Sequence, residues 1–235
     1  MNLIKLIFAI VFLFLPHTVT AASWYQVEVI VFDRLYPNLD GEQWQNEEFK
    51  MRDNLVELES ATAVLDSEQN LVPYMILDIN RHRLNGVNRV LKLSSEYRPL
   101  LHLSWQQPAA KRRQSRYVHI QKIDGEDSIP ITDPTIQNEL AEEPEFLEDL
   151  ITTEKVINGS IRIRSGFFLH ADIDLSYFKT LPVENKIIRT SEESFQNSFD
   201  KSVIKLKETR KIKLNEIHYF DHPMYGVILQ VSRLN

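Results

Sequence analysis

The stretch INGSIRIRSGFFLHADIDL, Ile157 to Leu175, consists of two runs in which apolar and polar residues alternate. Such alternation is typical of a β-strand that buries one face. A three-residue loop, 164–166, would join the runs, with Gly166 in the left-handed conformation that this loop requires. Every apolar residue then falls on one face, through the pairs Ile163 with Phe167, Ile161 with Leu169, Gly159 with Ala171, and Ile157 with Ile173. Because a one-residue slip would reverse the faces, the stretch predicts an antiparallel hairpin in this register.

Two further alternating runs flank a helical pattern earlier in the chain. The runs are WYQVEVIVF at 24–32 and LLHLSWQQ at 100–107, and each predicts a strand. Between them, residues 76–93 predict a helix, because its apolar side chains recur on one face. Those side chains are Leu77, Leu84, Val87 and Leu91.

The C-terminal part of the chain predicts two more strands and a turn. A basic run from Val203 alternates with apolar residues up to Leu214, and Ile217 and Tyr219 then have the opposite parity. This phase change near 215–216 indicates a β-bulge. The last block, EIHYFDHPMYGVILQV at 216–231, predicts a hairpin with a strand through Tyr219, a turn at 221–225 and a strand from Val227.

These patterns together predict an α+β fold, in which a mainly antiparallel sheet is covered on one side by the principal helix. Residues 23–235 would form a single domain with long loop excursions. One excursion, at about 123–154, holds 11 acidic residues and no Lys or Arg, so it does not easily build a packed core. It is expected to be loosely ordered, either as a solvated loop or as a tether for a basic partner.

The N-terminus has the three parts of a secretory signal peptide. Lys5 precedes the apolar run LIFAIVFLFL at 6–15, and small residues end at Ala22. The run is shorter than the ~20 residues that a membrane span needs. Cleavage near Ala22 would release a chain without membrane insertion. The 235-residue sequence contains no cysteine, so it has no disulfide and no thiol for a lipid anchor, and the predicted location is the periplasm.

Net charge argues against nucleic acid as a partner. The chain has 27 basic and 33 acidic residues, a net charge of -6, and a mildly acidic protein is a poor binder of nucleic acid. Basic residues nevertheless gather on the predicted strands: Arg162, Arg164, Lys205, Lys207, Lys211 and Lys213. They form either an ordinary polar sheet face or a surface that attracts an anionic polymer.

The His218–Asp221–His222 cluster raises the possibility of a metal site. A zinc motif with histidines four residues apart needs a helix, whereas Pro223 and the flanking strand patterns exclude a helix here. On a strand, residues four apart lie about 13 Å from each other, too far to share one ion. A turn could shorten that distance, but a third ligand such as His170 or His102 would still be needed.

Several motifs of catalytic sites are absent from the sequence. It contains no Cys, no GxSxG elbow and no glycine-rich phosphate loop. Asp172 and Asp174 alternate beside His170 on a strand, where paired carboxylates either do acid–base chemistry or are simply solvated. The sequence therefore predicts no enzyme, no catalytic residue and no cofactor.

Three blocks of the sequence resemble the CsiV family. They are WYQVEVIVFDR after the signal peptide, YRPLLHLSWQQP after the helix, and EIHYFDHPMYGVILQV near the end. The resemblance implies a non-enzymatic periplasmic protein that binds peptidoglycan and contributes to cell shape. It also implies support of a class A penicillin-binding protein, through the outer-membrane lipoprotein activator of that enzyme.

The motif positions of this resemblance supply the candidate residues for ligand or partner binding. They are Arg98, His102, Trp105, His218, Tyr219, Asp221 and His222. Trp105 shares the apolar face of its strand, so it is also a candidate core residue. Two alternative functions stay open: a periplasmic metal-dependent hydrolase using His218 and His222, and an envelope interaction module without affinity for glycan.

Overall fold

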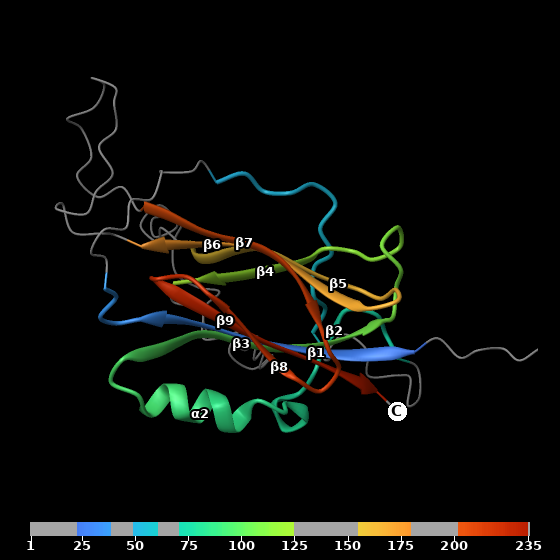
Figure 1. The fold of residues 1–235 in the computed structure, drawn as a ribbon, viewed down its shortest axis with the longest axis horizontal. Coiled ribbons are helices and arrows are strands. Elements are labelled where there is room, and N and C mark those ends of the chain that lie inside the picture. The colour runs from blue at the N-terminus through green and yellow to red at the C-terminus, as the bar shows by residue number, and fades with distance from the viewer. Residues whose placement is uncertain (1–22, 39–48, 61–70, 125–154, 180–201, 235) are drawn as a thin grey trace, which may run out of the picture.

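The chain folds into two antiparallel β-sheets that pack face to face (Figure 1). The computed structural model describes residues 23–38, 49–60, 71–124, 155–179 and 202–234. The first sheet has the strand order β2 (Met75–Ile76), β3 (Tyr97–Pro108), β1 (Trp24–Arg34), β9 (Tyr225–Leu234), β8 (Ile217–Asp221). The second sheet has the order β4 (Val118–Ile123), β5 (Lys155–Arg164), β6 (Leu169–Lys179), β7 (Ser202–Ile212). The predicted signal peptide, and the acidic excursion beyond residue 124, lie outside the described residues.

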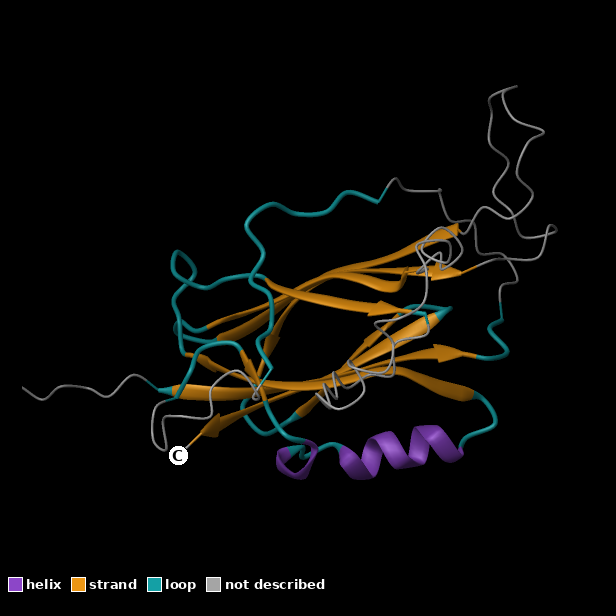
Figure 2. Cartoon of the chain, turned by 180° about the vertical axis from the view of Figure 1, so that it is seen from behind, coloured by secondary structure: helices purple, strands orange, loops and turns teal. Residues whose placement is uncertain are grey.

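The α+β prediction is wrong. Strands make up 57% of the described residues and helices 9%, so the architecture is that of two packed sheets. In Figure 2 the one α-helix of the described part, α2 (Asn85–Leu93), lies on the outer face of the first sheet, while the second sheet covers the opposite face. The main core is therefore built by two sheets and not by a sheet and a helix.

The main core lies between the sheets and explains the alternation in the sequence. In β1, Val27, Val29 and Val31 are fully buried against the second sheet. Its other face is also covered, because Ile30 and Phe32 pack with Leu84 and Leu91 beneath α2. This second, smaller core accounts for a strand that is apolar on both faces towards its end. None of the helices in the described ranges is long and apolar enough to span a membrane.

The helix predicted at 76–93 is shorter than expected. Only Asn85–Leu93 is α-helical, preceded by a 3₁₀ turn at Ile79–Arg81. Leu77 instead follows β2, and its N–H donates to the Ser104 carbonyl of the first sheet. The predicted apolar face survives because this extended segment also turns Leu77 inward. Side-chain burial was thus predicted correctly, although the backbone conformation of its first part was not.

The hairpin predicted at 157–175 forms, but its strands pair in a different register. Ile163 lies opposite Ala171 and Ile161 opposite Ile173, so each predicted pair is shifted by four residues in one strand. An even shift preserves the faces, and the isoleucines are buried as predicted. The observed register places Arg162 opposite Asp172, which the predicted one did not. The connection is longer, Phe167 is 95% exposed in it, and Gly166 does not adopt a left-handed conformation.

The predicted bulge near residues 215–216 is a turn between the two sheets. β7 ends at Ile212 in the second sheet, and β8 begins at Ile217 in the first. Asn215 takes a positive φ of 61° at this crossing. The parity changes because the chain changes sheets. The C-terminal hairpin itself is confirmed: β8 and β9 pair from Asp221 opposite Gly226 to Ile217 opposite Gln230.

Replacing Gly86 with alanine is expected to stabilise the protein by about 0.5–1 kcal/mol. Gly86 lies inside α2, and a Cβ atom there would meet no other atom within 4 Å. The substitution therefore removes backbone entropy from the unfolded chain without a steric cost. Urea unfolding measures the change. A loss of stability would contradict the helical assignment of this residue.

Candidate functional site

Basic side chains line the outer face of the second sheet. We call this surface the basic face and define it by Arg162, Arg164, Lys205, Lys207 and Lys211, together with Asp172 and Asp174. The apolar side chains of the same strands point into the core, so the alternation of β5–β7 turns every one of these charges outward. Five basic against two acidic groups give this face a net charge of +3, in a chain whose net charge is -6.

Asp172 organises one half of the basic face. Its carboxylate accepts hydrogen bonds from Arg162 Nε at 2.7 Å and from Arg164 Nε and Nη2 at 2.8 and 2.9 Å. Thr209 Oγ1 donates to it as well, at 2.9 Å. Burial alone would raise the pKa of Asp172, but the hydrogen bonds from the arginines and the threonine outweigh it and lower the pKa. These two arginines are therefore fixed in place, and Asp172 offsets one of their two positive charges.

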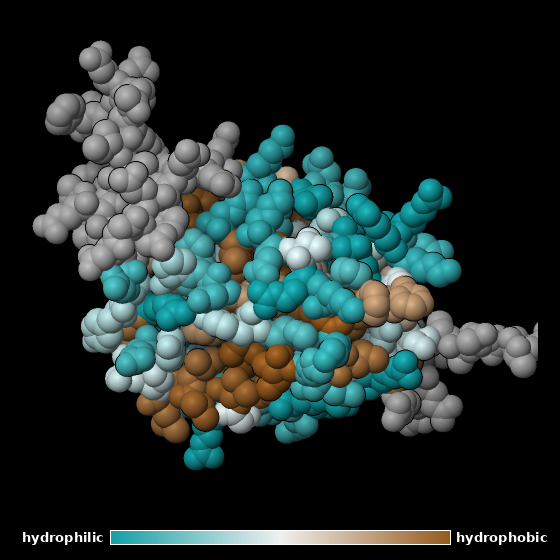
Figure 3. Space-filling model, viewed as in Figure 1, coloured by the Kyte–Doolittle hydropathy of each residue, from teal (hydrophilic) through white to brown (hydrophobic). Residues whose placement is uncertain are grey.

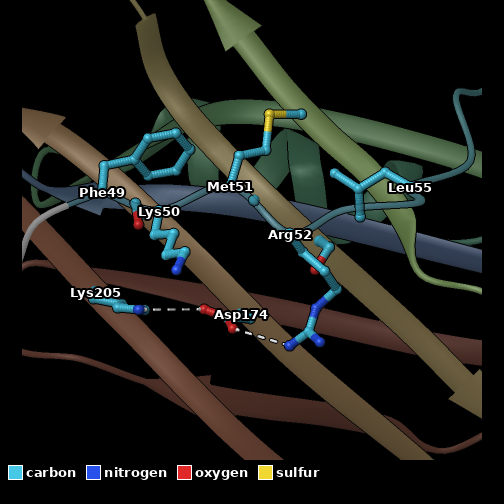
Figure 4. Close-up of a pocket in the computed structure, with 10 residues that line it drawn as sticks. Phe49, Lys50, Met51, Arg52, Leu55, Asp174 and Lys205 are labelled. Carbon is cyan, nitrogen blue, oxygen red and sulfur yellow. Dashed lines mark ion pairs between the residues drawn. The ribbon is translucent and has the colours of Figure 1, made fainter.

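A pocket opens beside this network, where residues 49–55 cross the sheet (Figure 4). The pocket is small and open to solvent, with Ser160 and Ser176 among its lining residues. Figure 4 shows Lys50, Arg52 and Lys205 directed towards Asp174. Arg52 and Lys205 form ion pairs with that carboxylate at 3.6 and 3.9 Å. Three cations around one carboxylate leave net positive charge in the pocket, which suits a second, incoming carboxylate.

Tyr117 ties the covering segment to the sheet. The guanidinium carbon of Arg52 lies 4.0 Å from the centre of the Tyr117 ring, and that of Arg162 lies 4.1 Å from it. Such cation–π contacts hold planar guanidinium groups in defined orientations. The pocket wall formed by residues 49–52 was missed by sequence reasoning, because this segment has no periodicity that assigns it to a sheet. Five of the six predicted basic strand residues lie on this face, since alternation placed them there, whereas Lys213 lies beyond the end of β7.

Two of the predicted site residues meet at the edge of the first sheet. Arg34 Nη2 donates to Asp221 Oδ1 at 2.7 Å and contacts the Tyr219 hydroxyl at 3.0 Å. The Tyr219 hydroxyl also donates to Asp221. We call Arg34, Tyr219 and Asp221 the arginine–tyrosine cluster. Burial and the bond to Asp221 raise the pKa of Tyr219 to about 12. Burial would raise the pKa of Asp221, but its bonds to Tyr219 and Arg34 lower it, so the cluster is a tyrosine, a carboxylate and a cation at neutral pH.

Gly226 makes the aromatic part of this cluster possible. The Phe32 and Tyr219 rings stack nearly parallel, with 6.0 Å between centroids and 14° between planes. A Cβ atom on Gly226 would lie 2.6 Å from Phe32 Cζ and 2.7 Å from Tyr219 Cε2. The glycine thus lets both rings lie close to β9. Tyr219 keeps 38% of its surface exposed, so its ring remains available for a contact.

Arg98 reaches a buried carboxylate at the same end of the first sheet. Its Nη2 donates to Asp33 Oδ2 at 2.9 Å, and the Tyr177 hydroxyl of the second sheet donates to the same oxygen at 3.0 Å. Asp33 is fully buried, whereas 59% of the Arg98 side chain is exposed. The bond to Asp33 outweighs burial and raises the pKa of Arg98. Arg98 therefore closes the rim between the two sheets.

The remaining four predicted residues are used in other ways. Trp105 is completely buried, and its Nε1 donates to Gln107. His102 contacts the buried Glu28 at 2.8 Å on the helix side of the sheet. His218 bonds to the Lys213 backbone, and His222 Nδ1 accepts the Met224 N–H inside the turn. In the part of the chain that the structure describes, neither His218 nor His222 belongs to a group of three side chains able to hold a metal ion.

A match over nearly the whole chain decides the family. Residues 3–234 match the family described as "Peptidoglycan-binding protein, CsiV". The chain belongs to the CsiV family. Comparisons with curated proteins and with solved structures give no match. The family is one of peptidoglycan-binding proteins, which implies a periplasmic location.

The blocks that carry the CsiV resemblance are neighbours in space. They form β1, the whole of β3, and the β8–β9 hairpin, which are four adjacent strands of the first sheet. The basic face lies on the other sheet, in segments that contributed nothing to the resemblance. The CsiV blocks therefore form the strands of the first sheet and the cluster at its edge, and they do not contribute to the basic face.

An apolar patch lies beside the arginine–tyrosine cluster. Figure 3 shows hydrophobic side chains gathered over α2 and the strands next to it. Exposed apolar residues of the helix and of the edge strand are Val90 and Leu93 on α2, 69% and 77% exposed, and Ile217 on β8, 53% exposed. Exposed apolar side chains gathered on one side of a protein are typical of a protein–protein contact.

Proposed function

We propose that this protein binds peptidoglycan in the periplasm without catalysing a reaction, and that it thereby supports a class A penicillin-binding protein through the outer-membrane lipoprotein activator of that enzyme. The observation that carries the first part is the CsiV match across residues 3–234. The absence of cysteine and of a GxSxG elbow in the sequence is compatible with a binding role.

We assign the polymer to the basic face. The stem peptides of peptidoglycan carry free carboxylates, which are anions along an otherwise polar chain. Lys207 and Lys211 are exposed on β7. Lys207 lies opposite Asp174, which lines the pocket together with Lys50, Arg52 and Lys205. Clustered cations attract such a polymer over a distance and hold its carboxylates in charge-assisted hydrogen bonds. Because these contacts are exposed, binding should weaken as the salt concentration rises.

We assign the contact with protein partners to the outer side of the first sheet, opposite the basic face. The arginine–tyrosine cluster lies on the helix side of the first sheet, and the exposed apolar residues Val90, Leu93 and Ile217 belong to α2 and β8 on that side. An aromatic side chain and an arginine beside exposed aliphatic groups match the composition of protein interfaces. Arg98, Tyr219 and Asp221 therefore remain proposed contact residues, whereas the burial of Trp105 makes it part of the core.

A sacculus pull-down tests the function and its placement together. The full chain is expected to sediment with purified sacculi at low salt, and the double variant Lys207→Glu/Lys211→Glu is expected to bind about tenfold more weakly, because each lost surface charge contact contributes up to about 1 kcal/mol. The matched control is Arg89→Glu/Lys92→Glu on α2, which makes the same change in charge on exposed helix residues.

The outcomes separate the competing functions. A wild-type chain that stays in the supernatant while a known binder sediments would overturn the proposal. Equal losses in both double variants would place the polymer away from the basic face. A chain that cross-links to the lipoprotein activator but leaves sacculi unbound would support an envelope interaction module without glycan affinity.

A further inference from the structure

Glu28, His82 and His102 form a buried group that peptidoglycan binding does not use. Glu28 lies on β1 and His102 on the adjacent β3, both on the helix side of the first sheet. His82 lies between the 3₁₀ turn and α2. The side chain of Glu28 is 1% exposed, that of His82 6% and that of His102 9%. Three potential ligands from three separate segments thus converge at one point beneath the surface.

The hydrogen bond of His82 fixes which of its ring nitrogens faces the group. His82 Nε2 lies 3.1 Å from the Leu77 carbonyl, which can only accept, so this nitrogen carries the proton. The other nitrogen, Nδ1, therefore presents a lone pair. It is buried and has no hydrogen-bond partner, and it lies 3.9 Å from Glu28 Oε1. A buried, unpartnered acceptor is costly in a fold, and a histidine held by a carbonyl through its outer N–H is the usual arrangement of a metal ligand.

The distances within the group suit a small divalent ion. His102 Nε2 lies 2.8 Å from Glu28 Oε1, and the ligand atoms of all three residues are within 4.8 Å of one another. Ligands bound to zinc at ~2.0–2.2 Å in tetrahedral geometry are about 3.3 Å apart. The observed distances lie on either side of that value, so ion binding would need small side-chain rotations. It would also release the proton that His102 Nε2 donates to Glu28. Two imidazoles and one carboxylate are a ligand set that zinc favours.

The carboxylate of the group is held in place by the backbone before α2. The N–H groups of Arg83 and Leu84 both donate to Glu28. Those two N–H groups donate at 2.7 and 2.8 Å and hold the carboxylate in a fixed orientation.

We propose that Glu28, His82 and His102 bind one zinc ion, which fastens the segment before α2 to the first sheet. The ion would give His82 Nδ1 the partner that it lacks. It would also join the N-terminal end of α2 to β1 and β3, which carry the CsiV blocks. This site is independent of the basic face and of the His218–His222 turn.

Zinc titration of the full chain, freed of metal by a chelator, tests the site. One equivalent is expected to bind, and the melting temperature is expected to rise by about 5–10 °C at a free zinc concentration of ~100 times Kd. Cobalt in place of zinc should give the visible absorption of a four- or five-coordinate ion. His82→Ala and, separately, His102→Gln are each expected to weaken zinc binding at least about tenfold.

The matched control is the double variant His218→Gln/His222→Gln, which should bind zinc like the wild type. Each variant is first compared with the wild type in the metal-free state by circular dichroism, so that misfolding is distinguished from loss of a ligand. No stoichiometric zinc, or binding that persists in both folded single variants, would overturn the proposal. Loss of binding only in the control would move the site to the C-terminal turn. The sacculus pull-down in the presence of chelator keeps this result separate from the proposed function.

Discussion

Replacing Gly159 with alanine is expected to destabilise the protein by about 3–5 kcal/mol. Gly159 lies in β5, between Ile120 of β4 and Leu175 of β6. Its φ is 156°, and a Cβ atom there would lie 2.2 Å from the Asp174 carbonyl oxygen and 2.8 Å from Leu175 Cα. Both are backbone atoms of β6, which is itself paired with β7, so they cannot move aside without opening the second sheet.

Urea unfolding followed by tryptophan fluorescence and circular dichroism measures this loss. At ~2–4 °C per kcal/mol, the melting temperature should fall by roughly 6–20 °C. Gly166→Ala is the control in the same hairpin, because the nearest atom to its Cβ would be the Phe168 carbonyl oxygen at an ordinary 3.7 Å. A Gly159→Ala variant as stable as Gly166→Ala would show that β5 and β6 are not as close as described.

Strand positions and buried faces could be predicted from the sequence because they depend on local alternation. Valines in β1 and isoleucines in β5 fall on the inner faces as expected, since period two is a property of the strand itself. The CsiV blocks were likewise recognised from contiguous residues. Features that depend on residues close together in the sequence could therefore be predicted.

The division into two sheets depends on contacts that are distant in the sequence. The parity change after Leu214 was interpreted as a bulge, but a change of sheet produces the same pattern. The register of the 157–175 hairpin was missed for a related reason. Faces are preserved by any even shift, and the pairing of Arg162 with Asp172, which alternation alone does not reveal, distinguishes the observed register.

The residues of the candidate site likewise fall into those that local alternation predicted and those that only the tertiary structure brings together. Arg162, Lys205 and their neighbours were predicted to share a face, because their strands alternate. The pocket required residues 49–55, which cross the second sheet without any repeating pattern. The group of Glu28, His82 and His102 likewise unites residues from three segments. Sequence pattern thus predicted the surface, while the cavity and the proposed zinc site needed the tertiary structure.

Replacing Asp172 with alanine is expected to destabilise the protein by about 3–5 kcal/mol at neutral pH. Arg162 and Arg164 are each 16% exposed, and Asp172 itself is 10% exposed. Removing the carboxylate leaves two largely buried guanidinium groups without their shared partner, and Thr209 without its acceptor. The cost arises from these uncompensated charges and not from lost apolar contacts. Thermal and urea unfolding at pH 7 measure it.

Acidification provides an independent check on this network. Because folding lowers the pKa of Asp172, its contribution is fully present above the unfolded value of about 3.9 and is lost as the pH falls through the folded value. The difference between wild type and Asp172→Ala should therefore shrink in strong acid. Asp174→Ala is the matched control on the same strand, since its ion pairs are 3.6 and 3.9 Å long and more exposed, and it should cost less than about 1 kcal/mol. Equal losses in the two variants at pH 7 would refute the special role of Asp172 and leave the basic face as a set of interchangeable surface charges.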